Sequence, residues 1–105
     1  MKRGEVWLVA LDPTVGSEIQ KTRPCLLVSP DVMIQGLRTV IVVPLTSRGH
    51  AASFRISASF KGVSGLLVLD QLRTVDKKRL LRRVGKLDGK TVDAALAMLR
   101  WIFAE

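Results

Sequence analysis

The sequence predicts a mainly β domain of the α+β class, a small twisted barrel or sandwich that a C-terminal α-helix closes. Short apolar runs rich in β-branched residues alternate with Gly and Pro turns over most of the chain. A helical period of apolar residues starts only near the end. The chain has 105 residues, about the size of one hydrophobic core, so we expect residues 1–105 to form a single domain.

The strand candidates are short runs of β-forming residues bounded by turn residues. We expect strands over residues 3–11, 25–29, 38–45, 54–57, 66–69, 72–75 and 82–87, with a turn over residues 61–65. Pro44 lies near the end of the third run, and because proline cannot donate to a ladder it indicates a sheet edge or a bulge. Residues 32–37 fit a single loose turn, and Asp76 is placed to cap a short helical turn.

The C-terminal segment changes to a helical period after Asp88, a favourable N-cap residue. One face of the expected helix collects six apolar side chains: Val92, Ala95, Leu96, Leu99, Ile102 and Phe103. Trp101 lies on the opposite side of the helical wheel, with Met98 at its flank. A large apolar group off the core face indicates a partner surface, and a lone exposed tryptophan is an equally good alternative.

The charge balance is strongly basic: 17 Lys and Arg against 9 Asp and Glu give a net charge of +8. Such a surface concentrates polyanions, which are nucleic acid, anionic lipid or an acidic protein, and a generic solubilising charge is the alternative. The densest basic tract, a candidate contact for RNA or for an acidic partner, comprises Lys77, Lys78, Arg79, Arg82, Arg83, Lys86 and Lys90.

Composition excludes several classes of protein and site. The N-terminus is charged and no apolar run has the length to cross a bilayer, so we expect a cytoplasmic protein without a membrane partner. The single Cys25 excludes a disulfide framework and fits a buried structural thiol. One cysteine and one histidine, His50, cannot form a zinc shell, and no Gly-rich phosphate loop precedes a helix. We expect no metal and no cofactor, and we expect His50 to be exposed.

The polar segment over residues 16–24 is the first candidate site. Arg23 precedes a proline, so its backbone is driven out of the α region and we expect it at the mouth of a strand. Glu18, Lys21 and Thr22 crowd beside it in the sequence. A rigid guanidinium suits phosphate chemistry because its planar fork matches two phosphate oxygens. A loop with a surface salt bridge is the alternative.

Two further polar pairs follow strand candidates: Thr46 with Ser47, and Asp70 with Gln71. If the strand after residue 38 lies beside the strand at residues 25–29, Arg23 and Thr46 approach each other across the sheet. We expect this approach to require the curvature of a barrel, which brings opposite strand ends together.

Five blocks carry a family resemblance over nearly the whole chain, in order and without large gaps: RGEVW (3–7), DPTVGSE (12–18), KTRPCLLV (21–28), VPLTS (43–47) and LDQLRTVD (69–76). They resemble the MazF/PemK/Kid family of toxin endoribonucleases, and the block with Gly-Ser-Glu followed by Arg-Pro is the most specific. The resemblance implies a small SH3-like barrel, a homodimer, and sequence-specific, metal-independent cleavage of single-stranded RNA such as mRNA. It also implies a cognate antitoxin with an acidic, disordered tail that occupies the RNA groove.

By this resemblance Arg23 is the catalytic arginine, Thr46 its partner and Glu18 the acidic residue of the same loop. The implied reaction is attack of a ribose 2′-OH on the adjacent phosphate, which leaves a 2′,3′-cyclic phosphate and a 5′-OH. A guanidinium with a pKa above about 12 holds its proton, so we expect Arg23 to stabilise developing charge. Glu18 is the candidate base provided that burial raises its pKa, whereas closeness to Arg23 would lower it. We expect substrate binding by the polar neighbours Ser17, Gln20, Lys21, Thr22, Ser47, Asp70 and Gln71.

The chain departs from the family pattern at two places. Some members carry an arginine where Val68 stands, and some use a histidine in the first loop, which here reads Thr14-Val15-Gly16. A non-catalytic inhibitor on the same fold, such as a DNA gyrase poison, and a basic nucleic-acid-binding module are the alternative functions. Gyrase poisons of that type depend on their C-terminal residues, which here form mostly a helix face, so the sequence favours the ribonuclease.

Overall fold

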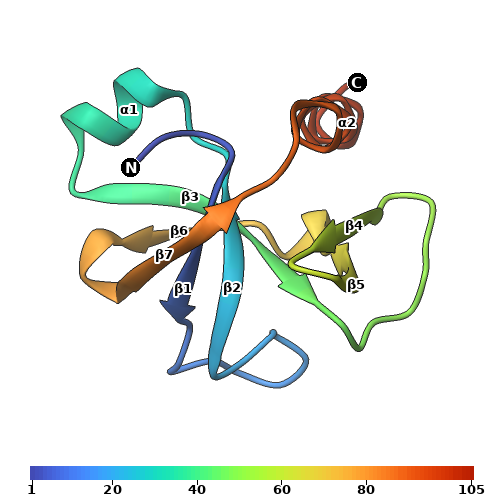
Figure 1. Ribbon diagram of the computed structural model, residues 1–105, viewed down its shortest axis with the longest axis horizontal. Helices are drawn as coiled ribbons and strands as arrows, with labels where there is room; N and C mark the ends of the chain where they lie inside the picture. The colour runs from blue at the N-terminus through green and yellow to red at the C-terminus, as the bar shows by residue number, and fades with distance from the viewer.

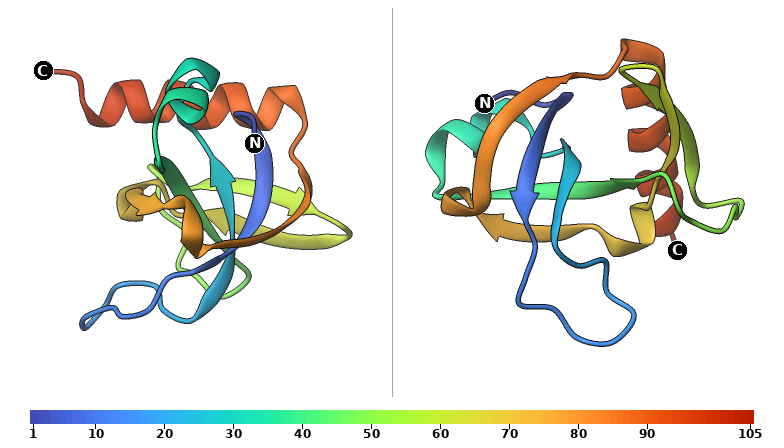
Figure 2. Two further views of the ribbon diagram at one scale, coloured as in Figure 1. Left: turned by 90° about the vertical axis from the view of Figure 1, so that its left-hand side faces the viewer. Right: turned by 60° about the horizontal axis from the view of Figure 1, so that its bottom comes forward.

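Seven antiparallel strands form one strongly curled sheet in the computed structural model, which describes residues 1–105 (Figure 1). The strands are β1 (Glu5–Ala10), β2 (Thr22–Leu27), β3 (Thr39–Thr46), β4 (Ile56–Phe60), β5 (Val63–Leu67), β6 (Arg73–Asp76) and β7 (Leu80–Lys86). The helices are α1 (Asp31–Gly36), the 3-10 turns η1 (Leu69–Gln71) and η2 (Lys77–Arg79), and α2 (Gly89–Ile102). The mainly β class with a C-terminal helix is confirmed, and the sheet curls into a half-barrel that α2 crosses on one side (Figure 2).

The strand order is β4-β5-β3-β2-β1-β7, and β6 pairs with the first half of β3. Pro44 lies where β3 exchanges β6 for β5, between the pairs Val42↔Arg73 and Leu45↔Leu67. Its carbonyl accepts a hydrogen bond from the Val68 amide at 2.9 Å. The prediction that Pro44 marks a sheet edge or a bulge is therefore wrong, because β3 is a central strand. Pro44 lies between the residues that pair with β6 and those that pair with β5, so no backbone N–H is needed there for a ladder hydrogen bond.

Several strand boundaries differ from those expected, and turn conformations explain the shifts. Lys21 has a positive φ of 71°, and β2 starts after it, three residues earlier than expected. Arg23 is the second residue of β2, so its expected place at the mouth of a strand is confirmed. The expected turn at residues 61–65 shrinks to Lys61 and Gly62, whose φ values of 52° and 77° form a tight hairpin between β4 and β5. The loose turn expected at residues 32–37 is the short helix α1.

Two apolar clusters occupy the two faces of the curled sheet. Alternate residues of β1 and β2 divide between them, with Val6 and Leu26 in one cluster and Val9, Cys25 and Leu27 in the other. Burial of each such side chain contributes roughly 1.5–3 kcal/mol to folding. Burial raises the pKa of the Cys25 thiol to about 12, which confirms an inert structural cysteine. His50 is exposed, as expected.

The helix α2 starts where the sequence predicts, after Asp88, whose carboxylate accepts a hydrogen bond from the Thr91 hydroxyl at 2.5 Å. The short turn capped by Asp76 is also confirmed, because its carboxylate accepts from the Lys78 amide at 2.8 Å. Five side chains of α2 pack on the first cluster besides the buried Ala95: Val92, Leu96, Met98, Leu99 and Ile102. The prediction that Phe103 lies on the apolar face of this helix is wrong. The helix ends at Ile102, so Phe103 leaves the helical period and is 71% exposed.

Neither helix has the combination of length and apolar character that a bilayer crossing requires.

Candidate active site

The pairing of β2 with β3 brings Arg23 and Thr46 together. The register Leu27↔Val42, Leu26↔Val43 and Cys25↔Pro44, continued by two residues, places Arg23 opposite Thr46. Both residues line one hollow, so their expected approach across the sheet is confirmed. The expected need for barrel curvature is wrong, because the start of one antiparallel strand lies beside the end of its neighbour in any sheet.

We call this site the Arg23–Thr46 hollow. Its lining comprises Arg23, Pro24, Leu45, Thr46, Ser47, Phe60, Lys61, Val63, Ser64 and Gly65. Two cations and three hydroxyl groups contribute, and no carboxylate does. The volume of about 250 Å³ lies below the range of about 300–1,000 Å³ that is usual for small-molecule pockets. The hollow therefore fits an anionic part of a larger substrate better than a whole ligand.

The Arg23 guanidinium is held by the backbone and not by an acid. Its Nε donates to the carbonyl oxygen of Gln20 at 3.1 Å. The two ion pairs of the protein, Arg55–Asp70 and Arg83–Glu5, leave Arg23 without a carboxylate partner. The surface salt bridge that was the alternative for this loop is therefore absent, and the terminal amino groups of Arg23 are free for an anion.

Thr46 is positioned by close backbone packing. Its Oγ1 accepts from the Arg48 amide at 3.1 Å and donates to the Arg48 carbonyl at 3.4 Å, which shapes the turn after β3. A Cβ atom on Gly65 would lie 2.7 Å from the carbonyl oxygen of Thr46. A glycine is therefore required for β5 to approach β3 at this point, and any larger residue would displace Thr46.

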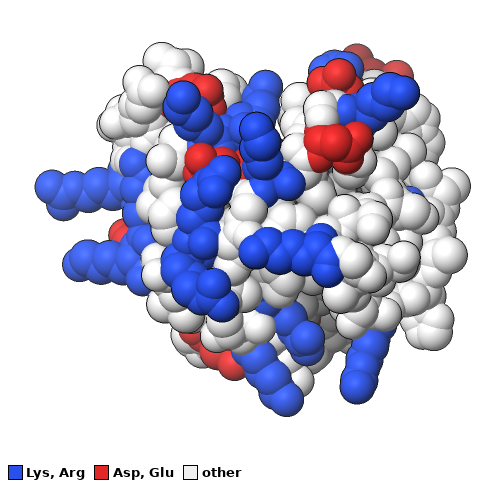
Figure 3. Space-filling view, viewed as in Figure 1, with Lys and Arg blue, Asp and Glu red and all other residues white.

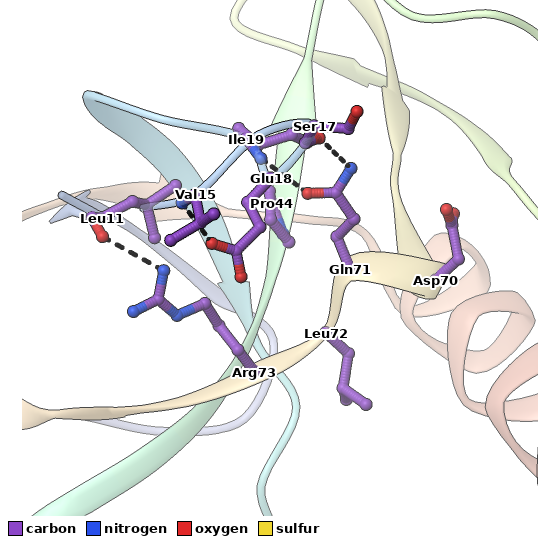
Figure 4. A pocket seen from close by; sticks show the side chains of 10 residues that line it. All are labelled: Leu11, Val15, Ser17, Glu18, Ile19, Pro44, Asp70, Gln71, Leu72 and Arg73. Carbon is purple, nitrogen blue, oxygen red and sulfur yellow. Dashed lines mark hydrogen bonds between the residues drawn. The ribbon is translucent and has the colours of Figure 1, made fainter. Parts of the chain in front are cut away.

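Glu18 lies outside the Arg23–Thr46 hollow. It lines a second hollow, the Glu18–Arg73 hollow, which contains Leu11, Val15, Ser17, Glu18, Ile19, Pro44, Asp70, Gln71, Leu72 and Arg73 (Figure 4). The Glu18 carboxylate accepts from the Val15 amide at 2.5 Å and the residue is exposed. The expectation that Glu18 crowds against Arg23 is therefore wrong, because the loop that carries Glu18 is bound to Gln71 of η1 and the two residues line different hollows (Figure 4).

Gln71 fixes that loop. Its Oε1 accepts from the Ile19 amide at 2.6 Å and its Nε2 donates to the Ser17 carbonyl at 3.3 Å (Figure 4). Arg73 adds a hydrogen bond from Nη1 to the Leu11 carbonyl at 3.1 Å. The side chains of Gln71 and Arg73 therefore use these polar atoms to hold the backbone of the segment between β1 and β2.

Asp70 is engaged by an arginine from the loop before β4. Arg55 donates from Nε and from Nη2 to the two carboxylate oxygens, each at 3.0 Å, and from Nη1 to the carbonyl of His50. These hydrogen bonds hold the pKa of Asp70 below its ordinary value. The pair ties the segment after Thr46 to η1. The other expected binding residues are all exposed. Ser17 lines the Glu18–Arg73 hollow and Ser47 lines the Arg23–Thr46 hollow, whereas Gln20, Lys21 and Thr22 line neither.

Sequence reasoning missed Phe60, Lys61 and Ser64 of the Arg23–Thr46 hollow. They belong to the β4–β5 hairpin, and its one sequence signal was the Lys61-Gly62 pair between two β-forming runs.

The basic tract does not act as one free surface. Arg79 donates to the carbonyls of Ala10 and Asp12, Lys77 donates to the carbonyl of Ile34, and Arg83 pairs with Glu5 at 3.2 Å. Lys and Arg side chains still cover much of the face that carries η2 and β7, whereas the β4–β5 side is mostly uncharged (Figure 3).

No three His, Cys, Asp or Glu side chains are grouped so that they could hold a metal ion.

Comparison with known proteins identifies the family. The family model described as the PemK-like, MazF-like toxin of type II toxin–antitoxin systems matches residues 2–103. Endoribonuclease PemK of Escherichia coli is 46% identical over 83 residues, which span 74% of this chain and 62% of PemK. Endoribonuclease EndoA of Bacillus subtilis is 33% identical over 99 residues, 89% of this chain and 85% of EndoA.

The fold agrees with this match. The crystal structure of MazF from Deinococcus radiodurans superposes with a TM-score of 0.87 at 22% identity and covers 97% of this chain and 94% of that MazF. The family model spans nearly the whole chain. The chain therefore belongs to the PemK-like, MazF-like toxins of type II toxin–antitoxin systems.

Proposed function

We propose that this toxin, an endoribonuclease, cuts single-stranded RNA by attack of a ribose 2′-OH on the adjacent phosphate, without a metal ion. The observation that carries this assignment is the hollow that Arg23 and Thr46 share, which cations and hydroxyls line and no carboxylate does. Negative charge builds on the phosphate oxygens as a fifth oxygen bonds to phosphorus, and fixed donors stabilise that charge. The relatives PemK and EndoA are endoribonucleases by name.

In the proposed reaction the 2′-oxygen bonds to phosphorus and the bond between phosphorus and the 5′-oxygen breaks. The 2′-OH loses its proton and the departing 5′-oxygen gains one. The products carry a 2′,3′-cyclic phosphate and a 5′-OH. Because DNA lacks the attacking hydroxyl, this chemistry is restricted to RNA.

Arg23 acts as a fixed positive charge in this reaction. Its terminal amino groups, which no protein acceptor engages, bind the two non-bridging oxygens of the scissile phosphate. The Thr46 hydroxyl leaves its 3.4 Å bond to the Arg48 carbonyl and donates to a phosphate oxygen instead. Since a guanidinium has a pKa above about 12, Arg23 is not assigned as the base.

Glu18 is assigned to the binding loop and not to proton transfer, because its carboxylate is exposed and faces the Glu18–Arg73 hollow. The nucleotides that flank the cut are then bound by polar residues of three segments: Ser17, Gln20, Lys21 and Thr22 before and at the start of β2, Ser47 after β3, and Asp70 and Gln71 in η1.

The first experiment incubates the protein with a long single-stranded RNA in EDTA and maps the cut ends. Cleavage in EDTA with 2′,3′-cyclic phosphate and 5′-OH ends is expected. A second RNA with one 2′-deoxy sugar at the mapped cut site is expected to bind equally well and to resist cleavage. Cleavage of this deoxy RNA at the same bond would show that 2′-OH attack is wrong, and loss of cleavage in EDTA would show that a metal ion takes part.

We propose in addition that the toxin forms a homodimer and that a cognate acidic antitoxin neutralises it. The family assignment and the net charge of +8 support the antitoxin. Trp101 and Phe103, which are 65% and 71% exposed at the end of α2, support a partner surface there. Trp101→Glu is expected to halve the mass measured by light scattering, and an unchanged mass would remove Trp101 from the dimer interface.

A further inference from the structure

The turn of the β4–β5 hairpin brings a second cation to the proposed catalytic site. Lys61 lines the same hollow as Arg23 and Thr46. Neither ion pair of the protein includes Lys61. Its Nζ lies over the face of the Phe60 ring, at 5.9 Å from the ring centroid. The ammonium group is therefore available to an anion that enters the hollow.

The turn conformation disfavours a lysine at this position. Lys61 and Gly62 have φ values of 52° and 77°, and both are required for the tight turn between Phe60 and Val63. Asn followed by Gly is the pair that such turns prefer, because asparagine tolerates the left-handed region better than a long side chain. Folding alone would therefore favour an asparagine at position 61, and the lysine is better explained by what its charge contacts.

The hairpin tip is held in place by β7. A Cβ atom on Gly85 would lie 2.9 Å from the Phe60 ring and 3.6 Å from Cε of Lys61. The bare backbone of Gly85 therefore makes room for both side chains. It does so at a bulge in β7, between the pairs Val6↔Gly85 and Trp7↔Arg83. Because the tip is seated on a strand, Lys61 projects from a fixed base and not from a free loop.

We propose that Lys61 binds the RNA phosphate next to the scissile one, from the β4–β5 side of the hollow, while Arg23 binds the scissile phosphate from β2. This inference rests on the proposed ribonuclease function and adds a substrate-binding residue to it. The charge on a neighbouring phosphate does not change during the reaction, so Lys61 binds the substrate and the transition state equally. Such uniform binding changes KM and leaves kcat unaltered.

The test compares Lys61→Asn with Lys61→Arg, and uses Lys2→Gln as a control that removes one exposed lysine outside both hollows and outside the basic tract. Dissociation constants are measured by fluorescence anisotropy on the RNA with a 2′-deoxy sugar at the cut site, over a range of salt concentrations. Lys61→Asn is expected to weaken binding roughly three- to tenfold and to reduce the slope of log affinity against log salt by about 0.7. Lys61→Arg is expected to retain both values, and Lys2→Gln is expected to match the unaltered protein.

Thermal unfolding separates this role from a structural one. Lys61→Asn is expected to unfold at the same or a higher temperature, since the turn prefers asparagine. On cleavable RNA the same variant should raise KM and leave kcat unchanged. A salt slope equal to that of the unaltered protein would overturn the assignment of Lys61, and so would a fall in kcat without a change in KM.

Failure of the proposed function gives a different pattern. If the unaltered protein binds the deoxy RNA but does not cut normal RNA, the cleavage function is wrong, and a reduced salt slope in Lys61→Asn still supports the phosphate contact. If the unaltered protein does not bind RNA at all, both assignments are wrong.

Discussion

The Glu18–Arg73 hollow and the Arg23–Thr46 hollow differ in what their polar groups do. In the Glu18–Arg73 hollow the two carboxylates and the amide have partners within the protein: Glu18 with Val15, Asp70 with Arg55, and Gln71 with Ser17 and Ile19. Arg73 has one hydrogen bond there, to the Leu11 carbonyl, and no ion pair. In the Arg23–Thr46 hollow the guanidinium of Arg23 has one backbone contact and Lys61 has no ion pair.

This difference separates a hollow that holds a loop in place from the hollow that we propose as the reactive site. The Glu18–Arg73 hollow is the larger of the two, at about 540 Å³ against about 250 Å³, yet its hydrogen bonds hold a loop in place. The Arg23–Thr46 hollow has two cations and no carboxylate to neutralise them, so its attraction for phosphate is strong. The larger hollow is therefore not the proposed reactive site, and the absence of a carboxylate beside the cations is what favours the smaller one.

The comparison predicts its largest effect at Arg23. Arg23→Ala is expected to reduce kcat by about 10²–10³-fold, as the loss of one oxyanion donor does, because the contact strengthens when the phosphate oxygens gain charge. The affinity for RNA with a 2′-deoxy sugar at the cut site should fall by no more than about tenfold, since one ordinary charge-assisted contact is lost. Single-turnover cleavage and anisotropy measure the two quantities. A full cleavage rate in this variant would move the catalytic role away from Arg23.

A smaller loss is expected at Thr46. Thr46→Val keeps the β-branched shape and removes the hydroxyl, so kcat should fall by about tenfold or more for one lost hydrogen bond that forms in the transition state. The same change removes the acceptor of the Arg48 amide in the turn after β3. Thr46→Ser retains the hydroxyl for both contacts and should recover most of the rate. If Ser and Val variants were equally slow, packing of the Thr46 methyl group and not its hydroxyl would matter.

Much of the fold could be predicted from the sequence because the signals are local. Asp76 and Asp88 stand at the start of the turn and of the helix that they were expected to begin, and the β-branched run of β3 is a buried strand. Where the sequence failed, the deciding contact was distant or conformational. The positive φ of Lys21 lengthens β2 so that Arg23 joins it, and the partner exchange on β3 accommodates Pro44.

The site could be predicted only in part for a similar reason. Arg23 and Thr46 meet because of strand register, which the neighbouring strands of the sequence suggest. Lys61 and Ser64 reach the same hollow through a hairpin whose packing depends on Gly65 beside Thr46 and on Gly85 beside Phe60. A glycine in the sequence does not show which distant backbone or side chain lies against it, so these close approaches could not be predicted. Glu18 is near Arg23 in sequence, yet the hydrogen bonds of Gln71 draw its loop toward η1.

The pair of Asp70 with Arg55 predicts a pH-dependent contribution to stability. The Arg55 hydrogen bonds lower the pKa of Asp70 in the folded protein below its ordinary value of 3.8. The folded state therefore favours the ionised carboxylate, so the stabilisation is present above 3.8 and is lost as the pH falls through the lower folded pKa. Asp70→Asn should lower the thermal midpoint at neutral pH, and its difference from the unaltered protein should shrink in acid. The exposed Asp93→Asn serves as the control, and a constant difference at all pH values would contradict the linkage.

The smallest effect on kcat is expected at Glu18. A large effect there would contradict the assignment of the two hollows to different roles. Glu18→Gln removes the charge and keeps an oxygen that accepts from the Val15 amide, so the loop should retain its shape. If the carboxylate only holds the loop, kcat should change by less than about threefold, well below the effect of losing a general base, which is about 10²–10⁴-fold. The pH–rate profile of kcat supplies a second measurement, because removal of a base abolishes the acidic limb of the profile. A fall in kcat of about 10²-fold or more, together with loss of the acidic limb, would show that Glu18 acts as a base. The Val15–Lys21 loop would then have to move when RNA binds and bring Glu18 to the scissile phosphate, so that the two hollows form one site. A near-normal rate with an unchanged profile would assign the transition-state stabilisation to the Arg23–Thr46 hollow alone.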